Sequence, residues 1–237
     1  MITSFPRQKE FASDDPERQN PTMPALRKPA RSLCTLKHEE RLWQRGAERV
    51  AGIDEAGRGP LAGPVVAAAV ILPAGFKLPG LNDSKQLPEK ARESYFERLT
   101  SDSRVSFGLG IASSEEIDRV NILRATYRAM ERAVAALSQP PNHLLIDGLP
   151  VPIFGACQTP LVDGDTKSLS IAAASVIAKV TRDRMMRLWH EEFPRYDFEN
   201  NKGYGTPGHL AQLQVHGPCP IHRRSFAPVA QTYLRLF

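Results

Sequence analysis

Short apolar runs alternate with amphipathic stretches over most of the chain, and this pattern predicts strands and helices in turn. Residues 50–53, 65–72, 103–112 and 143–146 combine apolar and β-branched residues between Gly, Pro, Asn or Asp, so each is predicted to be a strand. A fifth short strand is expected within residues 151–161. The strands together predict one mixed sheet.

Helices are predicted over residues 35–46, 88–99 and 168–193, and a consecutive pair within 113–137. In the longest of them, residues 171–178 are apolar on every side, so this part of the helix is expected to be buried. Strands that alternate with helices indicate an α/β fold, here with a helical C-terminal portion.

The N-terminal residues have a different composition. Residues 1–31 contain five prolines, mixed charges and few large apolar side chains, so they cannot bury enough surface to offset the entropy of ordering. We therefore divide the chain into an extension at 1–45, disordered or partly helical, and a main domain at 46–237.

Composition excludes some classes of protein. Among 237 residues, 41% are hydrophobic, and the longest nearly apolar run, residues 61–72, is too short for a membrane-spanning helix, which needs about 20. The three cysteines, Cys34, Cys157 and Cys219, lack the spacing of a zinc site or a disulfide framework, and we expect reduced thiols in a cytoplasmic protein. No membrane association is expected.

Charge is distributed unevenly along the chain. The net charge is +5, with basic segments at 1–49 and 179–237 and a slightly acidic centre at 50–178. This distribution suggests a polyanionic partner that approaches a site containing carboxylates, although chance variation in surface charge would look the same.

Carboxylates stand at the ends of the predicted elements. Asp54 and Glu55 follow one predicted strand, Asp147 follows another, and Asp165 precedes the longest helix. Each has an ordinary explanation, as a solvated edge, a turn or a helix cap. Because ligands of open α/β sheets bind at the carboxyl ends of strands, we expect these groups to converge there. Oxygen ligands in such a cluster suit Mg²⁺, and two such ions suit phosphodiester hydrolysis.

A glycine-rich segment follows the first pair of carboxylates. Gly57, Arg58 and Gly59 match neither the nucleotide-binding loop nor the dinucleotide-binding motif. The segment is either a plain turn or a place where backbone approaches a sugar-phosphate closely.

Several longer motifs resemble the bacterial ribonuclease HII family, in the right order and over about residues 48–229. They are Gly52–Val70, Asn82–Leu87, Asn121–Leu123, Ile146–Gly148, Gly164–Asp165, Ser170–Asp183, Asn201–Thr206 with His209, and His222–Phe226. The resemblance implies a ribonuclease H-like fold, with a mixed five-stranded sheet flanked by helices, for the catalytic domain at 46–237.

The resemblance also implies the chemistry. The family's metal ligands fall on Asp54, Glu55, Asp147 and Asp165, which would hold two Mg²⁺ or Mn²⁺ ions during catalysis, whereas Asp163 is expected to be a bystander. The fourth of these ligands, Asp165, is an aspartate, which resembles type HII of the family rather than type HIII. The implied enzyme is an endonuclease that cuts the RNA strand of RNA–DNA hybrids, and duplex DNA at embedded ribonucleotides, and leaves 5′-phosphate and 3′-hydroxyl ends.

Substrate contacts are implied in the same way. The backbone of Gly57, Arg58 and Gly59 and the ring of Tyr204 would read the ribonucleotide junction. Ser84, Lys85 and Asn121 are the candidates for phosphate contacts, with Lys179 and Arg182 as weaker ones. Such contacts position a duplex without reading its sequence.

The last expectations concern partners. Leu234, Leu236 and Phe237 resemble the end of bacterial sliding-clamp-binding peptides, although a tail packed on the core would look the same, and we expect a monomer. Two other functions remain open at this point: another two-metal nuclease on the same fold, and a nucleic-acid-binding protein without catalysis.

Overall fold

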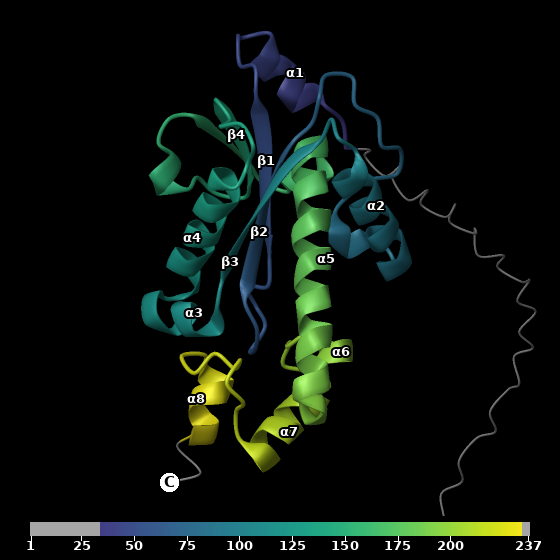
Figure 1. The fold of residues 1–237 in the computed structure, drawn as a ribbon. Coiled ribbons are helices and arrows are strands. Elements are labelled where there is room, and N and C mark those ends of the chain that lie inside the picture. The colour runs from purple at the N-terminus through teal and green to yellow at the C-terminus, as the bar shows by residue number, and fades with distance from the viewer. Residues whose placement is uncertain (1–33, 234–237) are drawn as a thin grey trace, which may run out of the picture. The chain divides into compact units, whose positions relative to one another are not determined.

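A mixed sheet of five strands forms the centre of the protein in a computed structural model, which describes residues 34–233 (Figure 1). The strand order is β3-β2-β1-β4-β5. β1 pairs antiparallel with β2 and parallel with β4, β3 is antiparallel to β2, and β5 is parallel to β4. The strands are β1 Val50–Ala56, β2 Val65–Ile71, β3 Ser106–Ala112, β4 His143–Asp147 and β5 Gln158–Leu161. The expected mixed five-stranded sheet is confirmed.

Helices cover both faces of this sheet. In Figure 1, the long helix α5 and helix α2 lie on one side of the strands, and α3 and α4 lie on the other. The helices are α1 Lys37–Trp43, α2 Glu89–Ser101, α3 Ser114–Val120, α4 Ile122–Ala135, α5 Leu169–Glu192, α6 Phe198–Asn201, α7 Pro207–His216 and α8 Ala227–Tyr233. Four 3₁₀ turns complete the described part: η1 Ser84–Gln86, η2 Pro152–Phe154, η3 Gly164–Thr166 and η4 Pro194–Tyr196. No helix in the described range has the length and apolarity to cross a membrane.

Strand β2 explains why both faces need a cover. Its side chains alternate between two hydrophobic clusters: Val66 and Val70 lie in the cluster with α5, and Val65 and Ala69 lie in the cluster with α4. A strand buried on both faces is continuously apolar, which is the pattern of residues 65–72 in the sequence.

Strand β1 has the same alternation, with a glycine where α5 approaches most closely. A Cβ atom on Gly52 would lie 2.3 Å from the backbone nitrogen of Ile171, so only glycine lets α5 lie against β1. Because side chains alternate along a strand, Asp54 lies on the same face as Gly52, toward α5.

Helix α1 contacts the start of α5. The buried carboxylate of Glu39 accepts hydrogen bonds from the hydroxyls of Ser168 and Ser170 and from the backbone N–H of Ser170. Cys34, Leu36 and Trp43 also contact the hydrophobic core, and the helix is shorter than the expected 35–46. The expected disordered tail at 1–31 lies outside the described residues, and the division at residue 46 stays a prediction.

Candidate active site

Three carboxylates from distant parts of the chain converge beside the sheet. Asp54, Asp147 and Asp165 each place a carboxylate oxygen within 4.8 Å of the other two. Asp54 lies in β1 and Asp147 ends β4, and the parallel register that pairs Ile53 with Ile146 sets these aspartates side by side. The convergence expected from strand ends is therefore present.

Asp165 reaches the cluster through the turn η3. The N–H of Gly164 donates to Oδ1 of Asp147 over 2.7 Å, which ties the turn to the end of β4. A Cβ on Gly164 would approach Cδ1 of Ile171 to 2.7 Å, so glycine allows this close contact. Asp163 is exposed and stands outside the cluster.

The position of Glu55 differs from the expectation. β1 continues to Ala56, so Asp54 and Glu55 lie within the strand and not beyond its end. Glu55 is not part of the three-carboxylate cluster; its Oε1 lies 3.2 Å from Nη1 of Arg58, and it lines the adjacent cavity. Glu55 is nevertheless close enough for its charge, after burial, to raise the pKa of Asp54.

Burial and crowding act on the protonation of the cluster. Burial, followed by the neighbouring charges of Glu55 and Asp147, raises the pKa of Asp54 well above its usual range. Burial and the charge of Asp147 raise the pKa of Asp165 to about 7. Both shifts disfavour the charged carboxylates when no cation is bound, because the groups are buried and their negative charges repel one another.

A divalent cation fits this set of donors. All three groups offer oxygen, the ligand atom that Mg²⁺ and Mn²⁺ prefer, and a cation would relieve the repulsion between them. Within the described residues, Lys85 brings its ammonium group to 4.0 Å from Asp165, at the edge of the cluster.

A cavity of about 340 Å³ opens next to the carboxylates. It is lined by six of the seven main candidates for substrate binding and by the two weaker ones, Lys179 and Arg182. Its lining residues are Glu55, Ala56, Gly57, Arg58, Gly59, Ser84, Lys85, Ser175, Lys179, Arg182 and Tyr204. The seventh, Asn121, is not among them: its φ is 70°, and its side chain accepts from the N–H of Arg124 at the start of α4.

Tyr204 lines the same cavity and lies close to the glycine-rich segment. A Cβ built on Gly59 would lie 3.7 Å from Cε1 of Tyr204, so the ring is close to the glycine backbone. The tyrosine is 46% exposed and lines the cavity. Its ring is available to a ligand that enters the cavity.

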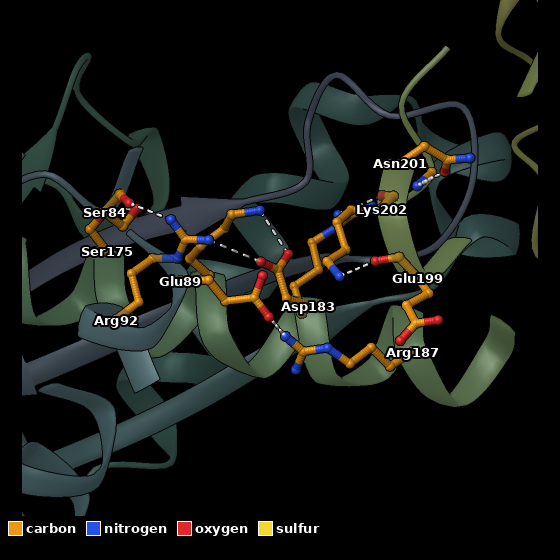
Figure 2. A network of polar contacts seen from close by, with 12 residues as sticks. Ser84, Glu89, Arg92, Ser175, Asp183, Arg187, Glu199, Asn201 and Lys202 are labelled. Atoms are coloured by element: carbon orange, nitrogen blue, oxygen red, sulfur yellow. Dashed lines mark hydrogen bonds and ion pairs between the residues drawn. The ribbon is translucent and has the colours of Figure 1, made fainter. Parts of the chain in front are cut away.

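The loop that carries Ser84 and Lys85 is fixed to α5 by a polar network (Figure 2). Arg92 donates from Nη1 to the carbonyls of Ser84 and Leu87, and its Nη2 lies 3.9 Å from the buried carboxylate of Asp183. Asp183 also accepts from Lys179 over 2.7 Å, so one carboxylate holds two cations beside the cavity. Sequence reasoning gave no role to Arg92, because a basic residue on an amphipathic helix has no distinguishing signal.

Arg182 is not on a solvated helix face. It is 1% exposed and donates to the carbonyls of Ala62, Pro64 and Lys202. Its guanidinium therefore binds backbone carbonyls. This differs from the sequence-based suggestion that Arg182 contacts a phosphate.

Two buried histidines support the segment that carries Tyr204. The Nε2 atoms of His209 and His222 lie 2.9 Å apart, Nδ1 of His209 lies 2.8 Å from the carbonyl of Tyr204, and the N–H of Cys219 points to Nδ1 of His222. A carbonyl only accepts and an N–H only donates. The assigned tautomers follow: His222 donates from Nε2 to His209, which donates from Nδ1 to Tyr204.

Burial, and then the neighbouring His209, lowers the pKa of His222 from 6.5 to about 4. Between these values His222 takes up a proton in the unfolded chain and not in the folded chain, so its contribution to the free energy of unfolding should fall as the pH drops from 6.5 toward 4, by up to about 1.4 kcal/mol per pH unit. The raised pKa values of Asp54 and Asp165 act in the opposite direction, so the test compares wild type with a variant. In urea unfolding at pH 7, 6 and 5, acid should destabilise His222→Gln less than wild type, and an equal pH dependence in both proteins would contradict the assignment. The exposed His216→Gln is the matched control.

Comparisons with known proteins agree with this geometry. The sequence matches the family Ribonuclease HII over residues 51–229. It is 51% identical, over 211 residues, to a ribonuclease HII of Listeria monocytogenes serovar 1/2a, covering 87% of this chain and 80% of the relative.

Two solved structures share the fold. The ribonuclease H2 of Pyrococcus horikoshii OT3 is 26% identical, with a TM-score of 0.66 over 79% of this chain and 98% of its own. The RNase HII of Archaeoglobus fulgidus, solved as a complex with PCNA, is 26% identical, with a TM-score of 0.64 over 75% of this chain and 95% of its own.

Proposed function

Because the chain belongs to the ribonuclease HII family and is an endoribonuclease that cleaves the RNA strand of RNA–DNA hybrids, we propose that Asp54, Glu55, Asp147 and Asp165 hold its catalytic metals. The observation that carries the proposal is the convergence of three of these carboxylates to within 4.8 Å, beside the cavity that Glu55 lines. The family is divalent-metal dependent, and Mg²⁺ and Mn²⁺ both suit these oxygen ligands.

The residues around the cavity would have different roles in catalysis. Asp54, Glu55, Asp147 and Asp165 would hold the divalent ions, which would supply an activated water and charge stabilisation for hydrolysis of the phosphodiester. Asp54 and Asp147 hold the metal site rigidly because they lie on paired central strands, and Asp165 is fixed to them through Gly164. Lys85 is available to a phosphate at the rim of the site, since its side chain is 77% exposed.

We propose further that the enzyme recognises single ribonucleotides embedded in DNA. The 2′-hydroxyl is the group that distinguishes RNA from DNA at one nucleotide. The backbone of Gly57, Arg58 and Gly59 lines the cavity with the Tyr204 ring close by, which supports a role for both in reading a ribose at the cleavage site. Ser84 and Lys85, which line the same cavity, would position phosphates of the duplex.

Cleavage of a defined duplex tests this proposal. A DNA duplex with one ribonucleotide should be cut next to it, with 5′-phosphate and 3′-hydroxyl ends, in Mg²⁺ or Mn²⁺ and not in EDTA. An all-DNA duplex of the same sequence is the control and should stay intact. Equal cutting of the two duplexes would favour a different two-metal nuclease, and binding without any cutting would favour a non-catalytic protein.

Neither the fold nor the family determines the clamp contact, the location in the cell or the oligomeric state. Leu234, Leu236 and Phe237 lie outside the described residues, and the Archaeoglobus relative, solved in complex with PCNA, supports a clamp contact for this chain as a proposal. The cytoplasmic location and the monomeric state stay predictions, as does a phosphate contact by Asn121.

A further inference from the structure

The loop between β1 and β2 rests on two buried arginines. Arg223, with no exposed surface, donates from Nη1 to the carbonyl of Arg58, from Nη2 to that of Gly57 and from Nε to that of Gly63. Arg182 binds the far side of the same loop through the carbonyls of Ala62 and Pro64. One guanidinium fork thus holds the two consecutive carbonyls at Gly57 and Arg58.

This arrangement determines where the amide N–H groups of the loop point. In a trans peptide the C=O and the following N–H point in opposite directions, and no cis peptide occurs among the described residues. With the carbonyls of Gly57 and Arg58 turned toward Arg223, the N–H groups of Arg58 and Gly59 must face away from it.

Both N–H groups are free to bind a ligand. Among the residues that the structure describes, neither the Arg58 N–H nor the Gly59 N–H donates a hydrogen bond to the protein. Gly57, Arg58 and Gly59 all line the cavity beside the carboxylates. Two adjacent backbone donors without a partner in the protein can bind an anionic or hydroxyl oxygen that enters such a cavity.

The buried guanidiniums of Arg182 and Arg223 have backbone carbonyls as partners instead of carboxylates. Within the described range, no carboxylate lies within 4.0 Å of the guanidinium of Arg223 or Arg182. Burial, and then the neighbouring charge of Arg182, lowers the pKa of Arg223 to about 9. A planar fork can bind several carbonyls at once, whereas a lysine ammonium acts as a point charge on a flexible stem.

We propose that Arg223 is a positioning residue for substrate recognition: by holding the carbonyls of Gly57 and Arg58, it aims the N–H groups of Arg58 and Gly59 at the 2′-hydroxyl and adjacent phosphate of a ribonucleotide. This inference rests on the proposed function, because it explains how the same cavity distinguishes a ribonucleotide from DNA. Arg223 touches no reacting atom and acts only through the peptides that it orients.

Arg223→Lys and Arg223→Met test the proposal against a merely structural role. Both are measured with wild type for melting temperature, for kcat and KM on the single-ribonucleotide duplex, and for Kd in EDTA on that duplex and on all-DNA duplex. We expect KM and Kd for the ribonucleotide duplex to rise at least tenfold and Kd for all-DNA to change less than twofold. An unchanged ratio of the two Kd values, or equal loss for both duplexes, would overturn the proposal.

Arg132→Lys is the control for replacing an arginine that binds a backbone carbonyl, because Arg132 donates to the carbonyl of Ile111 on the opposite side of the sheet. It should keep both Kd values. Wild-type cleavage of the ribonucleotide duplex is measured first, so a wild type that does not cut would refute the proposed function rather than this inference.

A measurement on the wild-type protein tests the proposal even if the Arg223 variants do not fold. With ¹⁵N-labelled wild type in EDTA, the ribonucleotide duplex should shift the amide proton signals of Arg58 and Gly59 clearly more than the all-DNA duplex does. Equal shifts with both duplexes, or no shift at these amides, would refute the positioning role.

Discussion

Asp54→Asn should reduce metal-dependent cleavage at least about a thousandfold while the protein still folds and binds the hybrid. The substitution removes a negative charge at the centre of the three-carboxylate cluster and leaves a neutral amide of the same shape. Because burial already disfavours the charged form of Asp54, the loss of charge should stabilise the metal-free protein slightly. Single-turnover cleavage in Mg²⁺ and hybrid binding in EDTA measure the two effects separately.

Asp163→Asn is the matched control for this experiment. Asp163 is exposed, stands outside the cluster, and has a φ of 52°, a left-handed conformation that asparagine adopts readily. The control should cleave like wild type. Undiminished cleavage by Asp54→Asn would refute the assignment of the site, and equal losses in both variants would mean that the effect is not specific to the cluster.

Gly52→Ala should unfold or strongly destabilise the protein, by about 3 kcal/mol or more. The added Cβ would lie 2.3 Å from backbone atoms of Ser170 and Ile171, and neither strand β1 nor helix α5 can yield without losing contacts in the core. Asp54 follows two residues later on the same face, so cleavage should fall as well, even below the melting temperature. Thermal and urea unfolding give the change in stability.

The control for Gly52→Ala is Gly208→Ala in α7. No atom lies within 4 Å of a Cβ built there, and its φ is ordinary for an L-residue. Alanine also has the higher helix propensity. This variant should melt at the wild-type temperature or slightly above it. If both glycine variants melted alike, the tight contact between β1 and α5 would not limit stability.

The runs of apolar residues predicted the sheet well, because a strand that is buried on both faces must be apolar along its length. The continuous apolar run of β2 and the glycine- or aspartate-bounded runs of β1 and β4 are consequences of helices on both faces. The ends of elements were less accurate: β1 extends through Asp54 and Glu55 to Ala56, because pairing with β2 continues past the last large apolar residue.

The candidate site could be predicted only for residues whose chemical type and place next to a predicted strand or helix both indicate a function. Carboxylates after strands indicated the cluster, but the separation of Glu55 from it depends on side-chain alternation within an extended strand. The roles of Arg223, Arg92 and the His209–His222 pair depend on hydrogen bonds to backbone carbonyls far away in the sequence. No local pattern encodes such partners.

The strand order also determines when this catalytic centre can exist during folding. β1 and β2 are neighbouring strands of one hairpin, whereas β3 joins β2 only after α2, and β4 joins β1 only after α3 and α4. Asp54 lies in the hairpin, and Asp147 meets it only through the long-range pairing of β4 with β1. A chain in which β4 has not paired would therefore present an incomplete set of ligands, and metal binding would add its free energy to folding only once that pairing has formed.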